Sequence, residues 1–215
     1  MSTFAVVPVK TLLKSKTRLS NIFTIQERRL FTLAMLEDVL NALKTSKVDE
    51  TVVVSSDSAV ETVVKGFGMT FLKETREGLN QALNQATRWC IRNHAETVLT
   101  LPADVPLIAP KDLESLAKMA MKDCVVISPS RNGGTNVLLQ TPPKVVAPSF
   151  GHDSFKKHFC KAQAKHVRTK IYVSASVMLD IDSESDLEQL LKAGQQTASH
   201  RFLKQSSWIS SRGAV

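Results

Sequence analysis

The stretch FAVVPVKTLLKSKTRL, residues 4–19, decides the fold. It opens with six residues, 4–9, that are apolar and rich in valine, which is typical of a strand buried on both faces of a parallel sheet. A polar segment with several cations begins immediately afterwards, at Lys10. The sequence therefore predicts a buried strand that ends in a basic loop.

Apolar runs of the same form recur along the chain, at 51–56, 97–104 and 124–130. Helical patterns separate them, and the expected helices are 24–44, 58–66, 79–94 and 110–121. Strands that alternate with helices in this way predict an α/β fold with a parallel sheet.

The pattern changes after residue 131. A glycine turn precedes a strand in RNGGTNVLLQ, residues 131–140, and a proline-containing connection follows it. A helix is expected near 154–164 and strands near 167–180. This order predicts that the parallel sheet gains a mixed or antiparallel edge.

A chain of 215 residues suits one domain with one main core. Its last expected helix starts at Ser183, which forms a capping-box pattern with Asp186, and ends at Gly194. We therefore assign the folded domain to residues 1–193. Residues 194–215 are polar and rich in serine, and are expected to form a loose, partly disordered tail or a docking segment.

Composition excludes several classes of protein. A hydrophobic fraction of 43% and a charged fraction of 22% indicate a globular protein rather than a disordered or fibrous one. No apolar run has the length of a membrane span or of a signal-peptide core, so a cytoplasmic location without a membrane partner is expected. Three widely spaced cysteines exclude a disulfide framework and a four-cysteine zinc site.

The net charge of +8 indicates an anionic partner, which can be a nucleic acid, a nucleotide or a phosphorylated metabolite. No GxGxxG or GxxxxGK[ST] motif follows the first strand. Instead, the basic loop contributes Lys10, Lys14, Lys16 and Arg18 at a strand end, where open parallel sheets bind ligands. These cations are placed to neutralise a triphosphate, and a solvated basic loop is the alternative.

Three aspartates are candidates for binding Mg²⁺. Asp104 follows a strand between Pro102 and Pro106, which restrict the backbone around it. Asp180 and Asp182 are two residues apart, so both can face the same side of an extended segment. Carboxylates are ligands that Mg²⁺ prefers, and an ordinary turn or cap aspartate is the alternative for each position.

Two glycine-containing segments are candidates for binding a small anion. Gly133, Gly134 and Thr135 form one, and Gly151 with Ser154 forms the other, next to an expected helix start. Unpaired amides and a positive dipole favour phosphate or carboxylate at such a start. A capped helix after a glycine turn is the alternative.

Three further polar residues lie near these segments. The side-chain amide of Asn80, which follows Gly78, is a weak candidate for reading a base edge. His152 and His158 have no metal-binding spacing and are expected at the surface or in support of the site. No GxSxG motif or Ser/His/Asp arrangement is evident, which disfavours covalent acyl chemistry.

Seven segments, taken in order, resemble the 2-phospho-L-lactate guanylyltransferase family of deazaflavin coenzyme F-420 biosynthesis. They are FAVVPVKTLLKSKTRL, VVVSSD, EGLNQAL, LPADVPLI, NGGTNVLL, FGHDSFKKH and DIDSESDL. The resemblance covers roughly residues 4–193. It implies a single-domain nucleotidyltransferase fold of the GT-A type, with a mixed, mostly parallel central sheet flanked by helices, and a homodimer.

The resemblance also implies a reaction. GTP and 2-phospho-L-lactate would give lactyl-2-diphospho-5′-guanosine and pyrophosphate with Mg²⁺ as cofactor, and some relatives use phosphoenolpyruvate instead. Thr135, Gly151 and Ser154 would hold the phospho-acid. Asp104, Asp180 and Asp182 would bind Mg²⁺. The residues expected to contact the nucleotide are Pro8, Val9, Lys10, Lys16, Arg18, Asp57, Gly78, Asn80, Pro102 and Ala103.

The sequence departs from the family at Arg131-Asn132, where many relatives carry an acidic residue beside the glycines, and this leaves the acceptor open. Another transferase of the same fold, acting on a sugar phosphate or with CTP, is one alternative. A basic nucleic-acid-binding module is another, but only 6% of residues are aromatic, no RNA-binding motif accompanies them, and no nucleic-acid partner is expected. A non-catalytic interaction subunit is disfavoured by the three aspartates.

Overall fold

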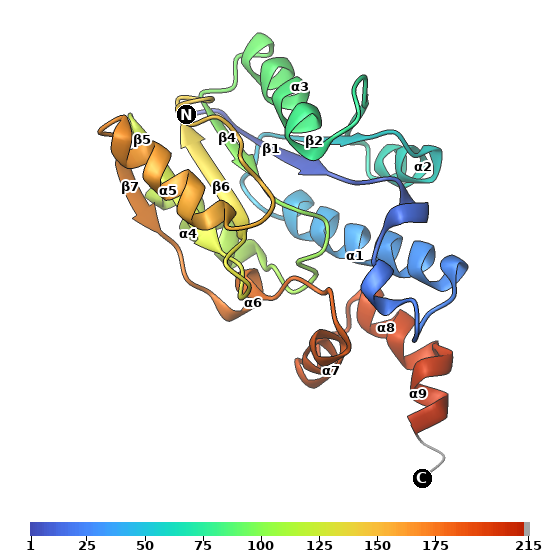
Figure 1. The fold of residues 1–215 in the computed structure, drawn as a ribbon. Helices are drawn as coiled ribbons and strands as arrows, with labels where there is room; N and C mark the ends of the chain where they lie inside the picture. Colours follow the sequence, from blue (N-terminus) through green and yellow to red (C-terminus); the bar gives the residue numbers. More distant parts are fainter. Residues whose placement is uncertain (213–215) are drawn as a thin grey trace.

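A computed structural model describes residues 1–212 as one mixed sheet covered by helices on both faces (Figure 1). Within these residues the sheet has seven strands in the order β3-β2-β1-β4-β6-β5-β7. The strands are β1 (Thr3–Pro8), β2 (Glu50–Ser55), β3 (Thr70–Lys73), β4 (Thr97–Thr100), β5 (Cys124–Pro129), β6 (Thr135–Thr141) and β7 (Arg168–Ile171).

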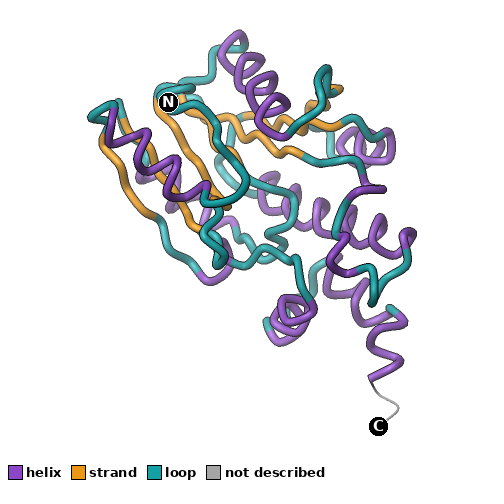
Figure 2. Tube along the Cα trace, in the orientation of Figure 1, coloured by secondary structure: helices purple, strands orange, loops and turns teal. Residues whose placement is uncertain are grey.

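The strand directions confirm a mixed, mostly parallel sheet. β1 runs parallel to β2 and β4, β2 runs parallel to β3, and β5 runs parallel to β7. β6 is antiparallel to both of its neighbours, β4 and β5. Six strands therefore end at the same edge of the sheet, and the loops that follow β1 and β4, its central parallel pair, meet there (Figure 2).

Helices form a layer on each face. The longer ones are α1 (Ile25–Lys44), α2 (Ser58–Gly66), α3 (Leu79–Arg92), α4 (Pro110–Met119), α5 (Ser154–Ala164), α7 (Glu184–Lys192) and α8 (Ala198–Gln205). Two short ones are α6 (Ala175–Met178) and α9 (Ser207–Arg212). No helix within residues 1–212 has the length and apolar character that a membrane crossing requires.

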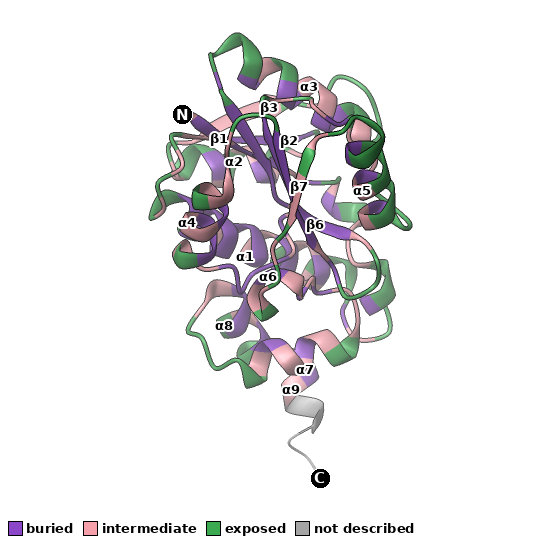
Figure 3. Ribbon diagram, turned by 90° about the vertical axis from the view of Figure 1, so that its left-hand side faces the viewer, coloured by how far each residue is buried: buried purple, intermediate pink, exposed green. Residues whose placement is uncertain are grey.

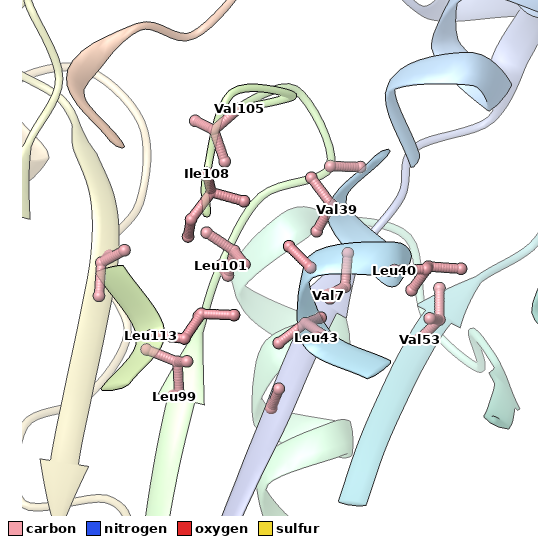
Figure 4. Packing of buried hydrophobic residues seen from close by; sticks show 14 of the residues in the cluster. Val7, Val39, Leu40, Leu43, Val53, Leu99, Leu101, Val105, Ile108 and Leu113 are labelled. Carbon is pink, nitrogen blue, oxygen red and sulfur yellow. The ribbon is translucent and has the colours of Figure 1, made fainter. Parts of the chain in front are cut away.

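Alternation along β1 shows why both faces are covered. Val7 and its neighbour two residues back pack with α1, α2 and α4, whereas Val6 packs with α3 on the opposite face. On the first face, Leu40 of α1 lies beside Val53 of β2, and Leu43 lies over Val7 of β1 (Figure 4). The valine-rich run that predicted a strand buried on both sides is confirmed.

The ends of the helices follow local capping chemistry. Thr24 caps α1 by accepting a hydrogen bond from the Glu27 amide, and the Glu27 carboxylate accepts one from the Thr24 amide at 2.9 Å. Before α7, the Asp186 carboxylate accepts from the Ser183 amide at 2.8 Å. Gly194 follows α7 at a φ of 67°, a conformation that glycine adopts without strain.

Residues 198–212 form α8 and α9 rather than a loose tail. The Phe202 ring stacks on Phe31 of α1 with ring centroids 5.4 Å apart, and Leu203 and Trp208 are buried in a second apolar cluster. Figure 3 shows these helices at the end of the molecule away from the sheet. Their few apolar residues are too widely spaced to reveal this packing in the sequence.

The prediction of strands near 167–180 is wrong for the second half of that segment. Only β7 forms, and α6 occupies the later part. The buried Asp112 carboxylate accepts hydrogen bonds from the hydroxyls of Ser174 and Ser176 at 2.9 and 2.8 Å. These bonds hold the segment in a helical turn against α4, so it does not continue along the sheet.

Candidate active site

A cavity of about 350 Å³ opens at the carboxyl ends of β1 and β4. Its lining combines several cations with two carboxylates. The lining residues are Pro8, Val9, Lys10, Lys14, Ser15, Lys16, Thr17, Arg18, Thr32, Leu79, Thr100, Pro102, Ala103, Asp104, Phe150 and Asp182. Seven of the ten residues expected to contact a nucleotide line this cavity. The other three, Asp57, Gly78 and Asn80, are not among its lining residues.

The basic loop has a folded backbone, while Lys10, Lys14 and Arg18 are exposed on it. It contains two short 3-10 helices, η1 (Leu12–Lys14) and η2 (Thr17–Leu19), whose leucines at positions 12 and 19 are buried. The Asp57 carboxylate accepts a hydrogen bond from the Leu12 amide at 3.1 Å and also caps α2. Asp57 therefore positions the loop and is placed outside the cavity lining.

Lys16 lies between two of the predicted metal-binding carboxylates. Its Nζ is 2.7 Å from Asp104 Oδ2 and 2.8 Å from Asp182 Oδ1, and its side chain is only 6% exposed. The backbone of Lys16 has a φ of 50°, which turns its side chain back into the cavity wall. One ammonium group thus joins the end of β4 to the segment before α7.

These charges set the pKa values of the pair. Burial alone would lower the pKa of Lys16, but the charges and hydrogen bonds of Asp104 and Asp182 outweigh it and raise that pKa. Burial would raise the pKa of Asp182, but the charge and hydrogen bond of Lys16 together with the charges of Arg18 and Lys10 outweigh it and lower that pKa. Lys16 is therefore a fixed cation and Asp182 an anion at neutral pH.

Asp180 has a different environment. Its Oδ1 accepts a hydrogen bond at 3.3 Å from the side-chain amide of Asn136, on β6. Burial and the nearby charge of Asp104 raise the pKa of Asp180. The Ile181 amide bonds to the Asp104 carbonyl at 3.0 Å, so the segments carrying the three aspartates lie side by side.

The donor set fits Mg²⁺ in part. Within the described residues, no three acidic, histidine or cysteine side chains form a group that could hold a metal by themselves. However, Mg²⁺ commonly uses one or two carboxylates together with substrate phosphates and water. Asp104 and Asp182 supply two such carboxylates on the cavity wall, and Lys16 Nζ lies between them.

The predicted acceptor residues lie together around the start of α5. The Gly134 amide donates to Ser130 Oγ at 2.9 Å, and the Phe155 amide donates to the Gly133 carbonyl at 3.2 Å. A Cβ on Gly134 would lie 2.7 Å from Ser130 Oγ and 3.8 Å from Ser154 Oγ, so a side chain here would have to displace the Ser130 hydroxyl. The glycine turn and the helix start, 20 residues apart in sequence, therefore meet in one surface region, where Thr135 and Ser154 are themselves buried.

His158 supports this surface from beneath. It is fully buried, with Nδ1 2.9 Å from the Thr135 hydroxyl and Nε2 accepting a hydrogen bond from the Ser149 amide at 2.9 Å. Burial lowers the pKa of His158 to about 4, aided by the charge of Lys161. His158 is thus neutral and internal rather than at the surface, whereas His152 is exposed.

The side-chain amide of Asn80 bonds to the backbone of Phe150. Its Nδ2 donates to the Phe150 carbonyl at 3.1 Å, and its Oδ1 accepts from the Phe150 amide at 2.9 Å. Both ends of the side chain therefore fix residue 150, which lines the cavity and whose ring meets that of His158 edge-on at 4.9 Å. The link between Asn80 and the acceptor surface, spanning 70 residues, has no local sequence signal.

Other lining residues were not singled out from the sequence. Leu79, Thr32 and Phe150 reach the cavity from α3, α1 and the loop before α5. Gly78 lines a second cavity of about 180 Å³ that adjoins the first. The only sequence signal for Leu79 was its position directly after Gly78 in the segment EGLNQAL.

Comparison with known proteins agrees with this geometry. The family described as "Guanylyl transferase CofC like" matches residues 3–211. A phosphoenolpyruvate guanylyltransferase from Rubrobacter xylanophilus is 39% identical over 196 residues, covering 90% of this chain and 96% of the relative. A 2-phospho-L-lactate guanylyltransferase from Methanothermobacter thermautotrophicus is 34% identical over 205 residues, covering 95% of this chain and 91% of the relative.

Solved structures show the same fold. A protein described as a nucleotide-diphospho-sugar transferase from Desulfovibrio desulfuricans G20 superposes with a TM-score of 0.79 at 15% identity, covering 95% of each chain. This likeness places the mixed sheet in the nucleotidyltransferase fold. With the family match over nearly its whole length, the chain belongs to the family of CofC-like guanylyl transferases.

Proposed function

We propose that this protein transfers GMP from GTP to the phosphate of 2-phospho-L-lactate, giving lactyl-2-diphospho-5′-guanosine and pyrophosphate in coenzyme F-420 biosynthesis. The observation that carries the proposal is the cavity at the ends of β1 and β4, which Lys10, Lys16 and Arg18 line together with Asp104 and Asp182. Such a wall suits a triphosphate, because cations neutralise its oxygens. The names of the relatives support guanosine as the nucleoside.

The transfer needs no protein nucleophile. An oxygen of the acceptor phosphate attacks the α-phosphorus of GTP, the bond from that phosphorus to the bridging oxygen breaks, and pyrophosphate leaves with the electron pair. The attacking oxygen is already anionic near pH 7, so a general base is unnecessary. The chain's contribution is to align the two phosphates and to neutralise their charge.

We assign these tasks to separate groups of residues. Lys10, Lys16 and Arg18 bind the triphosphate, while Thr135 and Ser154 hold the acceptor beside Gly151. Asp104 and Asp182 would hold Mg²⁺ together with phosphate oxygens, with Asp180 beside them. The bound ion would supply additional neutralisation of negative charge at the α-phosphate.

Phosphoenolpyruvate is the second candidate acceptor. The relative from Rubrobacter xylanophilus, at 39% identity, bears that activity in its name. Both candidates carry the phosphate oxygen and the carboxylate on the same carbon, so the same hydroxyls and amides suit either one. The Arg131 that precedes the glycine turn adds a cation near this surface.

The test is pyrophosphate release by the full-length protein with GTP and Mg²⁺, comparing the two acceptors and omitting each component in turn. Release that requires GTP and an acceptor supports the proposal, and the ratio of kcat/KM values identifies the acceptor. Replacing GTP with CTP tests the alternative that this is another transferase of the same fold. Pyrophosphate release with CTP but not with GTP would overturn the assignment of GTP.

A further inference from the structure

The second cavity adjoins the first on the side of β2 and α3. Five residues line both cavities: Pro8, Val9, Lys10, Lys14 and Leu79. The shared lysines lie where the second cavity meets the cationic wall. A nucleotide whose phosphates occupy the first cavity would therefore direct its base toward the second.

The walls of the second cavity suit a flat heterocycle. Val9, Val54, Leu79 and Ala82 contribute apolar surface, while the shared lysines lie toward the first cavity. Gly78 has a φ of 121°, and a Cβ built on it would meet only Gln81 Cγ, at 3.9 Å. The absence of a side chain at Gly78 therefore leaves open space for a ligand along this wall.

Two carboxylates, Glu74 and Glu77, also line this cavity, and they differ in their surroundings. Glu74 is half-buried, and its Oε1 accepts a hydrogen bond from the Gly78 amide at 3.2 Å. Glu77 is 92% exposed, and its Oε1 lies 3.3 Å from Lys14 Nζ. Glu74 is thus the carboxylate that the fold holds in place.

The backbone around Glu74 is fixed on both sides. Its amide donates to the Ser55 carbonyl at 2.9 Å, which extends the pairing of β3 with β2 by one residue. Gln85 of α3 donates to the Lys73 carbonyl at 2.8 Å and accepts from the Thr75 amide at 3.0 Å. A carboxylate anchored in this way loses little additional freedom when it binds a ligand.

We propose that the second cavity binds the guanine base and that Glu74 selects it, an inference that rests on the proposed use of GTP. Guanine presents two adjacent donors, N1–H and the 2-amino group, which a carboxylate can accept together. Adenine presents an unprotonated N1 at the same edge, whose lone pair repels a carboxylate. Because an unpaired polar group in a half-buried site is costly, one carboxylate here discriminates strongly between the two bases.

The unmodified protein provides the first test, which does not depend on a variant folding. Inosine triphosphate differs from GTP only in lacking the 2-amino group. We expect its kcat/KM to be lower on the order of 10-fold, the size of effect that one hydrogen bond to a charged group supports. Equal kcat/KM values for the two nucleotides would overturn the role of Glu74.

The second test is Glu74→Gln, with Glu61→Gln as the control, since Glu61 lies on α2 and lines neither of the two cavities. A glutamine amide donates where the carboxylate accepted, so it suits xanthine, which has a carbonyl oxygen in place of the 2-amino group. We expect Glu74→Gln to lose GTP use on the order of 10-fold or more and to gain use of xanthosine triphosphate. Glu61→Gln should keep the preference of the unmodified protein, and an unchanged preference in Glu74→Gln would overturn the inference.

The outcomes separate this inference from the proposed function. If the unmodified protein transfers GMP but Glu74→Gln leaves its preference for GTP unchanged, only the assignment of Glu74 fails. If the unmodified protein transfers no GMP to either acceptor, the proposed function fails and this inference falls with it. If Glu74→Gln gains use of xanthosine triphosphate and the control variant does not, both the inference and the proposed function are supported. A merely structural role for Glu74 would not create that gain.

Discussion

The imidazole of His158 fixes the orientation of the Thr135 hydroxyl. Because the Ser149 amide can only donate, ring atom Nε2 must be the acceptor, and the ring proton lies on Nδ1. That proton is donated to Thr135 Oγ1, 2.9 Å away. The threonine must then direct its own hydrogen elsewhere, which makes it a donor suited to an anionic acceptor.

Replacing Thr135 with valine tests this orientation. Thr135→Val keeps the shape of the side chain and removes the hydroxyl, so we expect the KM for the acceptor to rise about 10-fold. The KM for GTP should change little, because Thr135 lies outside the cationic cavity. Steady-state kinetics with each substrate varied in turn provide the measurement, with Ser154→Ala as a parallel variant. Equal increases in both KM values would argue against acceptor binding here.

The buried, neutral His158 also predicts how stability depends on pH. Its pKa of about 4 in the folded protein lies below the ordinary value of 6.5, so the unfolded chain binds more protons between these values. The contribution of neutral His158 to the free energy of unfolding should therefore be complete above pH 6.5. It should decrease as the pH falls toward 4. The loss from this one group is at most roughly 3 kcal/mol, at 1.36 kcal/mol per pKa unit.

Urea unfolding at several pH values measures this effect. His158→Gln removes the titrating group, so its free energy of unfolding should fall less steeply than that of the unmodified protein between pH 6.5 and 4. The comparison isolates His158 from the carboxylates that also titrate in acid. Identical pH dependence in the two proteins would show that His158 is not the group responsible.

The docking of α8 depends on Asp38 of α1. Its carboxylate accepts hydrogen bonds from the amides of Ala198 and Ser199, at 2.6 and 2.9 Å, in the first turn of α8. Asp38→Ala removes these hydrogen bonds between α1 and α8. The free energy of unfolding should therefore fall by about 1–2 kcal/mol. Thermal or urea unfolding measures it, with Glu37→Gln as the neighbouring control. No loss in Asp38→Ala would mean that apolar contacts alone hold α8.

Local patterns were enough to predict most of the sheet. Valine-rich runs such as 4–9 and 51–56 form strands whichever helices cover them, because both of their faces must be apolar. The capping box of Ser183 with Asp186 and the glycine after α7 likewise depend on neighbours within a few residues. Such features are readable because the interacting groups lie close together in sequence.

Features that depend on distant contacts were not predicted. Asn80 was expected to read a base, but its pairing with Phe150 becomes visible only when α3 and the loop before α5 meet. Lys16 was expected to contact phosphate, and its position between Asp104 and Asp182 depends on residues 88 and 166 positions away. Residue type indicated chemistry at these sites, whereas the partner of each group required the tertiary structure.

The arrangement of Asp104 and Lys16 leads to a prediction about catalysis. Asp104→Ala should reduce turnover roughly 100-fold or more, because it removes a carboxylate expected to hold Mg²⁺ at the reacting phosphates. The fold should persist, since Lys16 keeps Asp182 as a partner at 2.8 Å. Pyrophosphate release at increasing Mg²⁺ concentrations, together with circular dichroism, measures both effects.

Lys16→Ala is the informative comparison for Asp104→Ala. It should raise the KM for GTP, because a triphosphate-binding cation is lost. The Mg²⁺ concentration that gives half-maximal rate should rise in Asp104→Ala and should not rise in Lys16→Ala, because Lys16 carries no metal ligand and its removal leaves both carboxylates in place. If Asp104→Ala instead retains near-normal turnover and Mg²⁺ dependence, the role of Asp104 is to pair with Lys16, and the metal must be held elsewhere.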